Sequence, residues 1–401
     1  MLNNSKYLNK RIRKAQRLSF LFHLFFILPI KRNKVVFSTF EGDGGFCCNP
    51  RYIAEELHSR NKKLKLIWLT RKNSSDFPSY ITVKKYTLLS IVYHLATAKL
   101  WIDNYRKPFG TLKRKNQLYI QTWHASFGFK AVGLFRGNAF PEIARLVSEW
   151  DSKLVDCMIS NSAYCESVYP KKILYSGPTL RTGSPRVDCL INQKEKLREN
   201  IRECLKLDKE TKLALFAPTF RGGNQKGKKT VVSEIPSIDF VKLIEVLEEK
   251  FGGAWRILLR LHPQLSAKMK EMPLLNSCKN LFDVSQMPDM SQILGGVDVL
   301  ITDYSSCAFD AAFAGIPVFL YADDVQDYVK DRGEFMWKRE ELPFSISETN
   351  EELLKIIRNY SDEEYKASMK SFMQKHEVVE DGHASERVAD IIENVLRVKN
   401  R

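Results

Sequence analysis

The sequence predicts an α/β protein with two parallel, doubly wound sheets, and three observations support this prediction. Its 401 residues exceed the size at which a single hydrophobic core usually stops growing, so two domains are expected. Short β-branched and aromatic runs alternate with stretches of helical spacing along the chain. This alternation occurs in two successive halves, and a charged helical stretch at 192–207 separates them. With 44% hydrophobic and 27% charged residues, the composition argues against a disordered chain.

The first half is expected to form a domain over 34–207. It opens on the strand VVFSTF, the glycine-bearing loop EGDGG and a helix within PRYIAEELHSR, which is the start of a parallel α/β unit. A further helix is expected at 88–100. The remaining expected strands lie at 63–70, 80–87, 117–124, 154–162 and 172–178.

The second half, 208–401, repeats this pattern. Strands are expected within 212–220, 255–263, 280–285, 298–306 and 316–324, with helices at 289–297 and 307–315. Ligands of such sheets bind outside the carboxyl ends of the strands, so the polar residues that close each strand are the candidates for a site.

Residues 1–33 are predicted to form a basic, amphipathic, membrane-associating segment. The run LSFLFHLFFILPI, Leu18 to Ile30, is too short to span a bilayer, and no signal-peptide cleavage site follows it. A helix lying in the interface of an anionic membrane fits both the charge and the apolar length. The alternative is a buried first helix of the domain. No acidic residue occurs in 1–34, whereas nine basic residues do: Lys6, Lys10, Arg11, Arg13, Lys14, Arg17, Lys31, Arg32 and Lys34.

The remaining charge and the cysteines exclude several classes of protein. The net charge of +16 is concentrated in that first segment, and no nucleic-acid recognition module is present, so we expect no nucleic-acid partner. The eight cysteines show no C-x-x-C pair and no metal-finger spacing, which favours free thiols in a reducing compartment and no structural metal. A Mg²⁺ ion loosely bound with a diphosphate is compatible with the sequence.

Two histidines close predicted strands in different halves. His124 ends QTWH and His262 follows Arg260 in RLHP. A histidine at a strand end can accept a proton from a hydroxyl group, and an arginine beside it suits phosphate oxygens. Taken alone, each histidine is better explained by a structural role. Because both would face one cleft between the domains, we favour catalysis.

The second half offers further candidates for anion binding. Thr302, Ser305 and Ser306 precede an apolar helix and suit an anion site or an ordinary helix cap. Asp310, one turn into that helix, is a solvent-facing acid or a ribose contact. Arg221, before the basic loop GGNQKGKK, either orders over a diphosphate or lies in a solvated turn. The chain has no G-x-x-x-x-G-K-[ST] loop, which disfavours nucleoside-triphosphate hydrolysis.

Seven motifs in order resemble the CDP-glycerol glycerophosphotransferase family, which contains the teichoic acid primases and polymerases. The likeness covers roughly residues 35–395. The motifs are FEGDGGFCCNPRYIAEEL, QTWH, TGSPRVD, APTFR, RLHP, ITDYSSCAFDAAFAGIPVFLYADD and DGHASERVADII.

The resemblance implies a glycosyltransferase-B arrangement of two Rossmann-like domains, with the acceptor on the first and a CDP-alcohol on the second. It implies that glycerol phosphate is transferred from CDP-glycerol, or ribitol phosphate from CDP-ribitol, to a lipid-linked polymer acceptor at the cytoplasmic face of the cell membrane, with release of CMP. His124 would deprotonate the acceptor and His262 would assist at the diphosphate. The donor would be bound by Arg221, Arg260, Thr302, Ser305, Ser306 and Asp310.

One segment departs from the family pattern. After tryptophan and histidine the family commonly continues with glycine-threonine-proline and two lysines, whereas this chain reads ASFGFKA, and only Lys130 remains of the basic pair. Lys130 and Trp123 are candidate acceptor contacts. The competing interpretation is a sugar-nucleotide-dependent glycosyltransferase of the same two-domain build, which would need a ribose-binding glutamate where this chain has Asp310.

Overall fold

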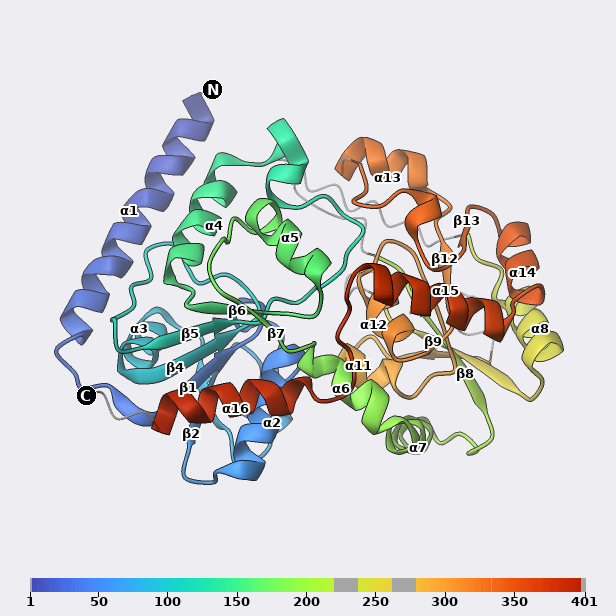
Figure 1. Ribbon diagram of the computed structural model, residues 1–401, viewed down its shortest axis with the longest axis horizontal. Helices are drawn as coiled ribbons and strands as arrows, with labels where there is room; N and C mark the ends of the chain where they lie inside the picture. Colours follow the sequence, from blue (N-terminus) through green and yellow to red (C-terminus); the bar gives the residue numbers. More distant parts are fainter. Residues whose placement is uncertain (1, 220–236, 262–278, 333, 398–401) are drawn as a thin grey trace. The chain divides into compact units, whose positions relative to one another are not determined.

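The computed structural model describes residues 2–219, 237–261, 279–332 and 334–397 (Figure 1). The chain divides into two compact units. The N-terminal unit comprises Met1–Ser126, Val132–Asp188 and Glu377–Arg401, and the C-terminal unit comprises Phe127–Ala131 and Cys189–His376.

Both units contain a parallel sheet with helices on its faces, which confirms the predicted α/β class. In the N-terminal unit the seven strands are ordered β3-β2-β1-β4-β5-β6-β7. All pair in parallel, and the central strands are buried on both faces, as parallel sheets require. The strands are β1 Lys31–Ser38, β2 Lys65–Thr70, β3 Thr82–Lys85, β4 Ala98–Asp103, β5 Leu118–Gln121, β6 Cys157–Ser160 and β7 Thr179–Arg181.

Helices cover both faces of this sheet. On one face α2 and α16 bury apolar residues with Val35, Phe37 and Trp68. On the other face α1 and α3 pack over Val36 and Trp101. The helical segments are α1 Leu2–Phe25, η1 Phe40–Gly42, α2 Cys48–Arg60, η2 Ser74–Asp76, α3 Leu88–Thr97, η3 Gly133–Ala139, α4 Glu142–Leu154, α5 Ala163–Lys172 and α16 Ala384–Arg397. The helix α6, Pro185–Asn192, begins in this unit and continues into the C-terminal unit from Cys189.

The first helix is longer than the apolar run and has two different faces. Leu18 and Phe22 are buried in the core beneath it, as the alternative of a buried first helix requires. Phe20 and Leu24 point away from that core, with 61% and 53% of their surface exposed, and Ile27 just beyond the helix is 86% exposed. α1 therefore both completes the core and presents an apolar strip beside its basic residues.

One of the nine basic residues does not belong to that exposed surface. Lys34 lies within β1 and is buried, and its Nζ donates a hydrogen bond to Thr97 Oγ1 at 2.7 Å. Burial lowers the pKa of Lys34 to about 8. Among the helices that the structure describes, none is long and apolar enough to cross a membrane.

The C-terminal unit contains a six-stranded parallel sheet ordered β10-β9-β8-β11-β12-β13. Its strands are β8 Lys212–Ala217, β9 Trp255–Leu259, β10 Leu281–Asp283, β11 Val299–Thr302, β12 Val318–Tyr321 and β13 Ile346–Ser347. Its helical segments are α7 Lys194–Leu205, α8 Phe240–Phe251, α11 Met290–Leu294, α12 Cys307–Phe313, α13 Val325–Arg332, η4 Arg339–Glu341, α14 Asn350–Arg358 and α15 Asp362–Lys375.

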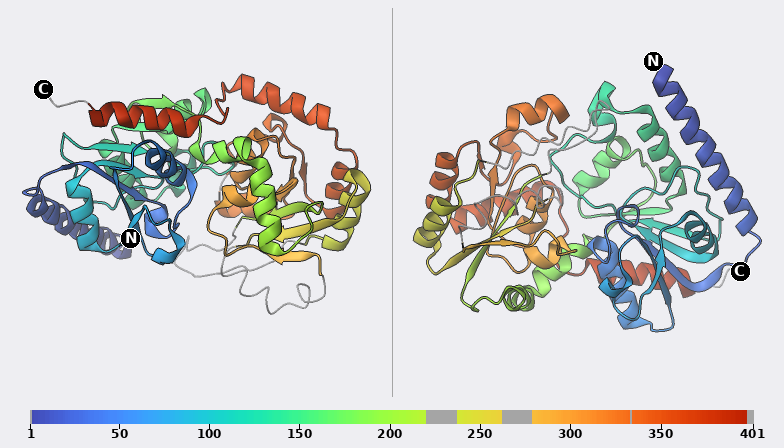
Figure 2. Two further views of the ribbon diagram at one scale, coloured as in Figure 1. Left: turned by 90° about the horizontal axis from the view of Figure 1, so that it is seen from below. Right: turned by 180° about the vertical axis from the view of Figure 1, so that it is seen from behind.

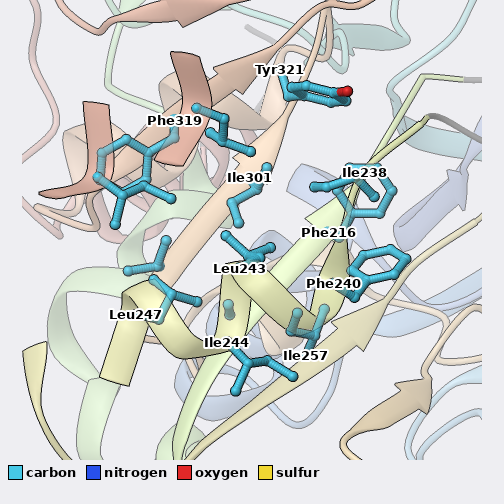
Figure 3. Packing of buried hydrophobic residues seen from close by; sticks show 14 of the residues in the cluster. Phe216, Ile238, Phe240, Leu243, Ile244, Leu247, Ile257, Ile301, Phe319 and Tyr321 are labelled. Carbon is cyan, nitrogen blue, oxygen red and sulfur yellow. The ribbon is translucent and has the colours of Figure 1, made fainter. Parts of the chain in front are cut away.

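The core of this unit lies between α8 and the sheet. Figure 3 shows Leu243 and Leu247 of α8 packed in one cluster with Ile257 of β9 and Ile301 of β11. Leu243, Leu247, Ile257 and Ile301 have no accessible surface. Burial of aliphatic side chains of this kind is the main stabilising term of such a layer.

The division of the structure differs from the predicted boundary near residue 207. α7 belongs to the C-terminal unit, because Leu197 and Ile201 pack closely on Gly295 and Gly296. Arg198 Nη1 also contacts Asp298 at 2.5 Å. The charged stretch that looked like a linker is thus a helix of the second unit.

The chain end also differs from the predicted division, because α16 returns to the N-terminal unit (Figures 1 and 2, in red). Val388 and Ile392 are buried there against Ile53 and Leu57 of α2. The carboxylate of Asp188 accepts hydrogen bonds from the first two backbone amides of α16, at 3.0 and 2.6 Å.

Candidate functional site

The loop that follows β5 carries Trp123 and His124 at the carboxyl edge of the first sheet. Trp123 has a φ of 50°, a left-handed conformation that is strained for a bulky residue. Asn49, at the start of α2, holds this turn: its Nδ2 donates to the carbonyls of Thr122 and Trp123, both at 3.2 Å. Its Oδ1 accepts a hydrogen bond from Arg186 N at 3.1 Å. Asn49 therefore links the N-P-R, Q-T-W-H and G-S-P-R motifs through buried hydrogen bonds.

His124 is held in a defined tautomer. Its Nδ1 lies 2.8 Å from Asn104 O, and because a carbonyl can only accept, Nδ1 must carry the proton. Nε2 then bears a lone pair. The ring centroids of Phe40, Tyr105 and Trp123 lie 5.3, 5.8 and 4.5 Å from that of His124. This arrangement is the one that a general base needs.

The surroundings of His124 favour its neutral form. Burial lowers the pKa of His124 to about 4, against the hydrogen bond to the backbone, which raises it. Three cations, Arg186, Lys172 and Arg106, lower the pKa further. Lys172 is buried, and its Nζ donates to Ser126 O at 3.0 Å. At neutral pH the imidazole is therefore uncharged within a positively charged neighbourhood.

The segment after this loop belongs to the other unit. Phe127–Ala131 packs within the C-terminal unit, where Phe127 is 1% exposed. Trp337 Nε1 donates to Gly128 O at 3.1 Å, and Met336 N donates to Phe129 O at 2.8 Å. The rings around Phe127 have centroids 5.2–6.0 Å away and belong to Phe309, Phe313, Trp337, Phe372 and His376.

The two candidate acceptor contacts belong to different units. Trp123 is buried in the N-terminal unit beside His124. Lys130 belongs to the C-terminal unit, pairs with Phe335 in an antiparallel bridge, and places its Nζ 5.8 Å from the Tyr328 ring centroid. Its side chain is exposed.

In the C-terminal unit, two of the candidate donor residues make bonds to the backbone. Arg260, which follows β9, donates from Nη1 to Met287 O at 2.6 Å. Thr302 is fully buried, and its hydroxyl donates to Ala217 O at 2.6 Å, which joins β11 to β8. The Thr302 hydroxyl is therefore engaged in holding the sheet edge.

Ser305 and Ser306 lie directly before α12 and are half-buried. The side chain of Ser306 makes no capping hydrogen bond to the helix, and Ser305 Oγ lies 3.5 Å from Cys307 N. Asp310, in the first turn of α12, is buried with 8% exposure, so the solvent-facing alternative is wrong.

The predicted residues His262 and Arg221 lie outside the described residues. Other residues were missed by sequence reasoning. Asp303 is buried, and its two carboxylate oxygens accept from Thr219 N, both at 2.9 Å. Beside it, a cavity of about 110 Å³ opens at the ends of β11 and β12, with Tyr304 and Phe129 in its wall.

Asn49 was also missed as a residue of the site, although the N-P-R motif that contains it could have indicated its role.

Within the described part of the chain, no group of three or more His, Cys, Asp or Glu side chains gathers as metal ligands would.

Comparison with known proteins shows which family has these features. The family model of CDP-Glycerol:Poly(glycerophosphate) glycerophosphotransferase matches residues 20–394. The teichoic acid poly(glycerol phosphate) polymerase of Bacillus subtilis is 26% identical over 97% of this chain, which spans only 52% of that relative. The teichoic acid poly(glycerol phosphate) polymerase of Bacillus spizizenii is 27% identical over 93% of this chain and 95% of the relative. The teichoic acid poly(ribitol-phosphate) polymerase of Bacillus spizizenii is 29% identical, over 98% of this chain and 61% of the relative.

Solved structures agree on the fold. The wall teichoic acid polymerase TagF superposes with a TM-score of 0.80 at 24% identity, covering 99% of this chain and 98% of that one. The Staphylococcus aureus MnaA-UDP structure has a TM-score of 0.54 at 15% identity, over 92% of this chain and 98% of that one. The two parallel sheets therefore have the glycosyltransferase-B-like fold of TagF. By its match over 20–394, the chain belongs to the CDP-glycerol:poly(glycerophosphate) glycerophosphotransferase family.

Proposed function

We propose that this protein transfers glycerol phosphate, or a related alditol phosphate such as ribitol phosphate, from a CDP-activated donor to a hydroxyl group of a lipid-linked or polymeric acceptor. CMP is the second product, and the reaction belongs to the synthesis of teichoic acid or a capsule-type polymer. Family membership supports the donor class, and a TagF structure obtained with CDPG supports it further. Relatives that make glycerol-phosphate and ribitol-phosphate polymers leave both alditols in the proposal.

The observation that carries the proposal is the tautomer of His124. With Nδ1–H held by Asn104 O, the Nε2 lone pair is oriented to accept the proton of the acceptor hydroxyl. The freed oxygen attacks the phosphorus that bears the alditol, a new P–O bond forms, and the P–O bond to CMP breaks. CMP leaves with the electron pair, and the proton remains on Nε2.

The donor is proposed to bind to the C-terminal unit. Arg221, Arg260 and His262 would offset the charge of the diphosphate, with Ser305, Ser306 and Asp310 at the nucleotide. The engaged hydroxyl of Thr302 supports an indirect role for that residue, as a tie that fixes the strand end beneath the serines. Because phosphoryl transfer requires little covalent help from the protein, positioning and charge stabilisation would supply most of the rate. A Mg²⁺ ion arriving with the diphosphate is compatible with this scheme.

We also propose that α1 associates with the anionic cytoplasmic face of the cell membrane, where a lipid-linked acceptor would be available. The exposed Phe20, Leu24 and Ile27 beside a basic surface support this. Removing the segment would also expose the core that Leu18 and Phe22 complete, so substitutions are the better test. Phe20→Glu with Leu24→Glu should reduce sedimentation with anionic liposomes, and Gln16→Glu is a matched control. Equal sedimentation of all three proteins would contradict the proposal.

CMP release tests the transfer reaction directly. Wild type, His124→Ala and His262→Ala are compared with CDP-glycerol and with CDP-ribitol, using a lipid-linked acceptor. Release by wild type that collapses in both variants supports the reaction and identifies the donor. If a folded wild type releases no CMP from either donor, yet binds a UDP-sugar, a sugar-nucleotide-dependent glycosyltransferase becomes the better proposal.

A further inference from the structure

Arg106 lies three residues after β4, near other cations, and the proposed reaction gives it no role. Its guanidinium carbon lies 4.9 Å from the ring centroid of Trp123, the residue before the catalytic base. Among the described residues its Nη2 is buried and has no hydrogen-bond partner. No ion pair joins Arg106 to any acid of that described part.

Neighbouring buried cations show how unusual this is. Lys107 contacts Asp103 at 2.5 Å, and Lys172 donates to backbone carbonyl groups. A buried charge that lacks such a partner is costly, because the water it has lost is not replaced. Among the described residues, the guanidinium of Arg106 lies over the face of Trp123, whose cation–π attraction offsets part of that cost.

Asp151, the acid with the largest electrostatic effect on Arg106, already has other hydrogen-bond partners. Asp151 Oδ1 accepts hydrogen bonds from Lys107 N at 2.8 Å and from Tyr119 Oη at 3.3 Å. Burial also raises the pKa of Asp151 to about 7, so its carboxyl group is partly protonated at neutral pH. It therefore neutralises Arg106 only in part.

The guanidinium group of Arg106 and its position beside His124 indicate which ligand it would bind. A planar guanidinium binds phosphate oxygens through paired, charge-assisted hydrogen bonds. Arg106 also lies close enough to His124 to lower its pKa, and Trp123 touches both side chains. In a glycerol phosphate chain, the terminal hydroxyl is separated from the phosphate of its own unit by three carbons. A hydroxyl at His124 therefore brings that phosphate to a neighbouring cation.

We propose that Arg106, supported on the ring of Trp123, binds the terminal phosphodiester of the acceptor. This deepens the proposed function and rests on it. It follows that the preferred acceptor already ends in an alditol phosphate, as in chain extension, and does not end in an uncharged sugar.

The test compares two synthetic lipid acceptors under CMP release with the active CDP-alditol. One ends in a glycerol phosphodiester, and the other is identical except for an uncharged methylphosphonate in place of that phosphate. Wild type should favour the phosphodiester acceptor in kcat/KM. Arg106→Met should lower kcat/KM for the phosphodiester about ten- to hundredfold, as expected for a lost charge-assisted hydrogen-bond pair, and most of that loss should vanish with the uncharged acceptor.

Two further variants complete the design. Arg106→Lys keeps the charge without the planar fork and should recover part of the rate. Arg145→Met removes an exposed arginine of α4 and should behave as wild type with both acceptors. Unchanged CDP-alditol affinity and melting temperature show that a variant is folded.

The outcomes separate this inference from the function on which it rests. Equal losses of Arg106→Met with both acceptors, or no loss with either, overturn the phosphate site while transfer stands. If Arg106→Met does not fold, the other two proteins still test the phosphate site. The site is overturned if wild type shows no preference in kcat/KM for the phosphodiester acceptor. It is also overturned if Arg106→Lys shows the same preference as wild type. Failure of wild type to release CMP with any acceptor refutes the proposed function itself.

Discussion

Replacing His124 by glutamine should change the pH dependence of both activity and stability, because a single pKa controls both. In the folded protein, burial and nearby cations lower the pKa of His124 from 6.5 to about 4. The base remains neutral until the pH falls to about 4. The acid limb of kcat/KM, which reports the free enzyme, should therefore lie near pH 4. An anionic donor stabilises the protonated ring, so the limb of kcat should lie at higher pH.

The same pKa predicts a loss of stability in acid, with a defined sign. Above pH 6.5 the imidazole is neutral in both the folded and the unfolded chain and contributes nothing. Between pH 6.5 and 4 the unfolded chain takes up the proton and the folded chain does not, so stability decreases as the pH falls. The difference between a pKa of 6.5 and one of about 4 corresponds to about 3 kcal/mol.

His94 provides a matched control. It is buried on α3 in the same unit, and burial also lowers its pKa to about 4, but it is not among the candidate catalytic residues. Urea unfolding from pH 7.5 to 4 should show that His94→Gln and His124→Gln each remove a similar part of the pH dependence. Only His124→Gln should lower kcat, by about a hundredfold or more, as for loss of a general base.

Two results would refute this reasoning. One is an acid limb of kcat/KM near pH 6.5, which would mean that the imidazole is solvated as in a free peptide. The other is a His124→Gln enzyme that retains clearly more than about a hundredth of kcat, since general-base catalysis contributes at least about a hundredfold.

Three further predictions concern the residues that hold the site. Asn49→Ala removes two donated hydrogen bonds and one accepted hydrogen bond. In urea unfolding it should destabilise the N-terminal unit by about 2–4 kcal/mol, and it should also lower kcat. The control Asn33→Ala loses one exposed hydrogen bond and should leave the stability nearly unchanged. Phe127→Ala should lower the stability of the C-terminal unit by about 3–5 kcal/mol in thermal unfolding, and a change below about 1 kcal/mol would show that the aromatic cluster does not anchor this segment. Asp188→Ala removes the carboxylate that accepts two hydrogen bonds from the start of α16. It should increase amide hydrogen exchange in that helix while the affinity for the donor stays unchanged. Exchange equal to that of wild type would show that these hydrogen bonds do not hold the helix.

Much of the fold could be predicted because it depends on local patterns. The alternation of strands and helices predicted two parallel sheets, and the rule that ligands bind at carboxyl strand ends directed attention to the loop of His124. These inferences need only the period of the apolar residues and their direction along the chain.

What could not be predicted depends on partners far apart in the sequence. Phe127 has the local sequence of a loop, yet it belongs to the C-terminal unit and is buried there against Phe309 and Phe372. α16 has an ordinary amphipathic pattern, which does not say that its apolar face packs against α2. The hydrogen bond that fixes the tautomer of His124 comes from a backbone carbonyl, that of Asn104, and carbonyls carry no sequence signal.

The same long-range bonds explain how a strained loop can carry a precisely placed base. Trp123 has a left-handed φ, which costs of the order of 1–3 kcal/mol and persists only when surrounding groups determine it. Asn49 holds the carbonyl groups before His124, Asn104 holds its ring, and Lys172 holds the carbonyl of Ser126 after it. Because all of these bonds are made by the protein's own groups, the protein itself fixes the orientation of the imidazole. The binding energy of the acceptor is then available for placing its hydroxyl group, which is where the proposed contact between Arg106 and the acceptor phosphate would act.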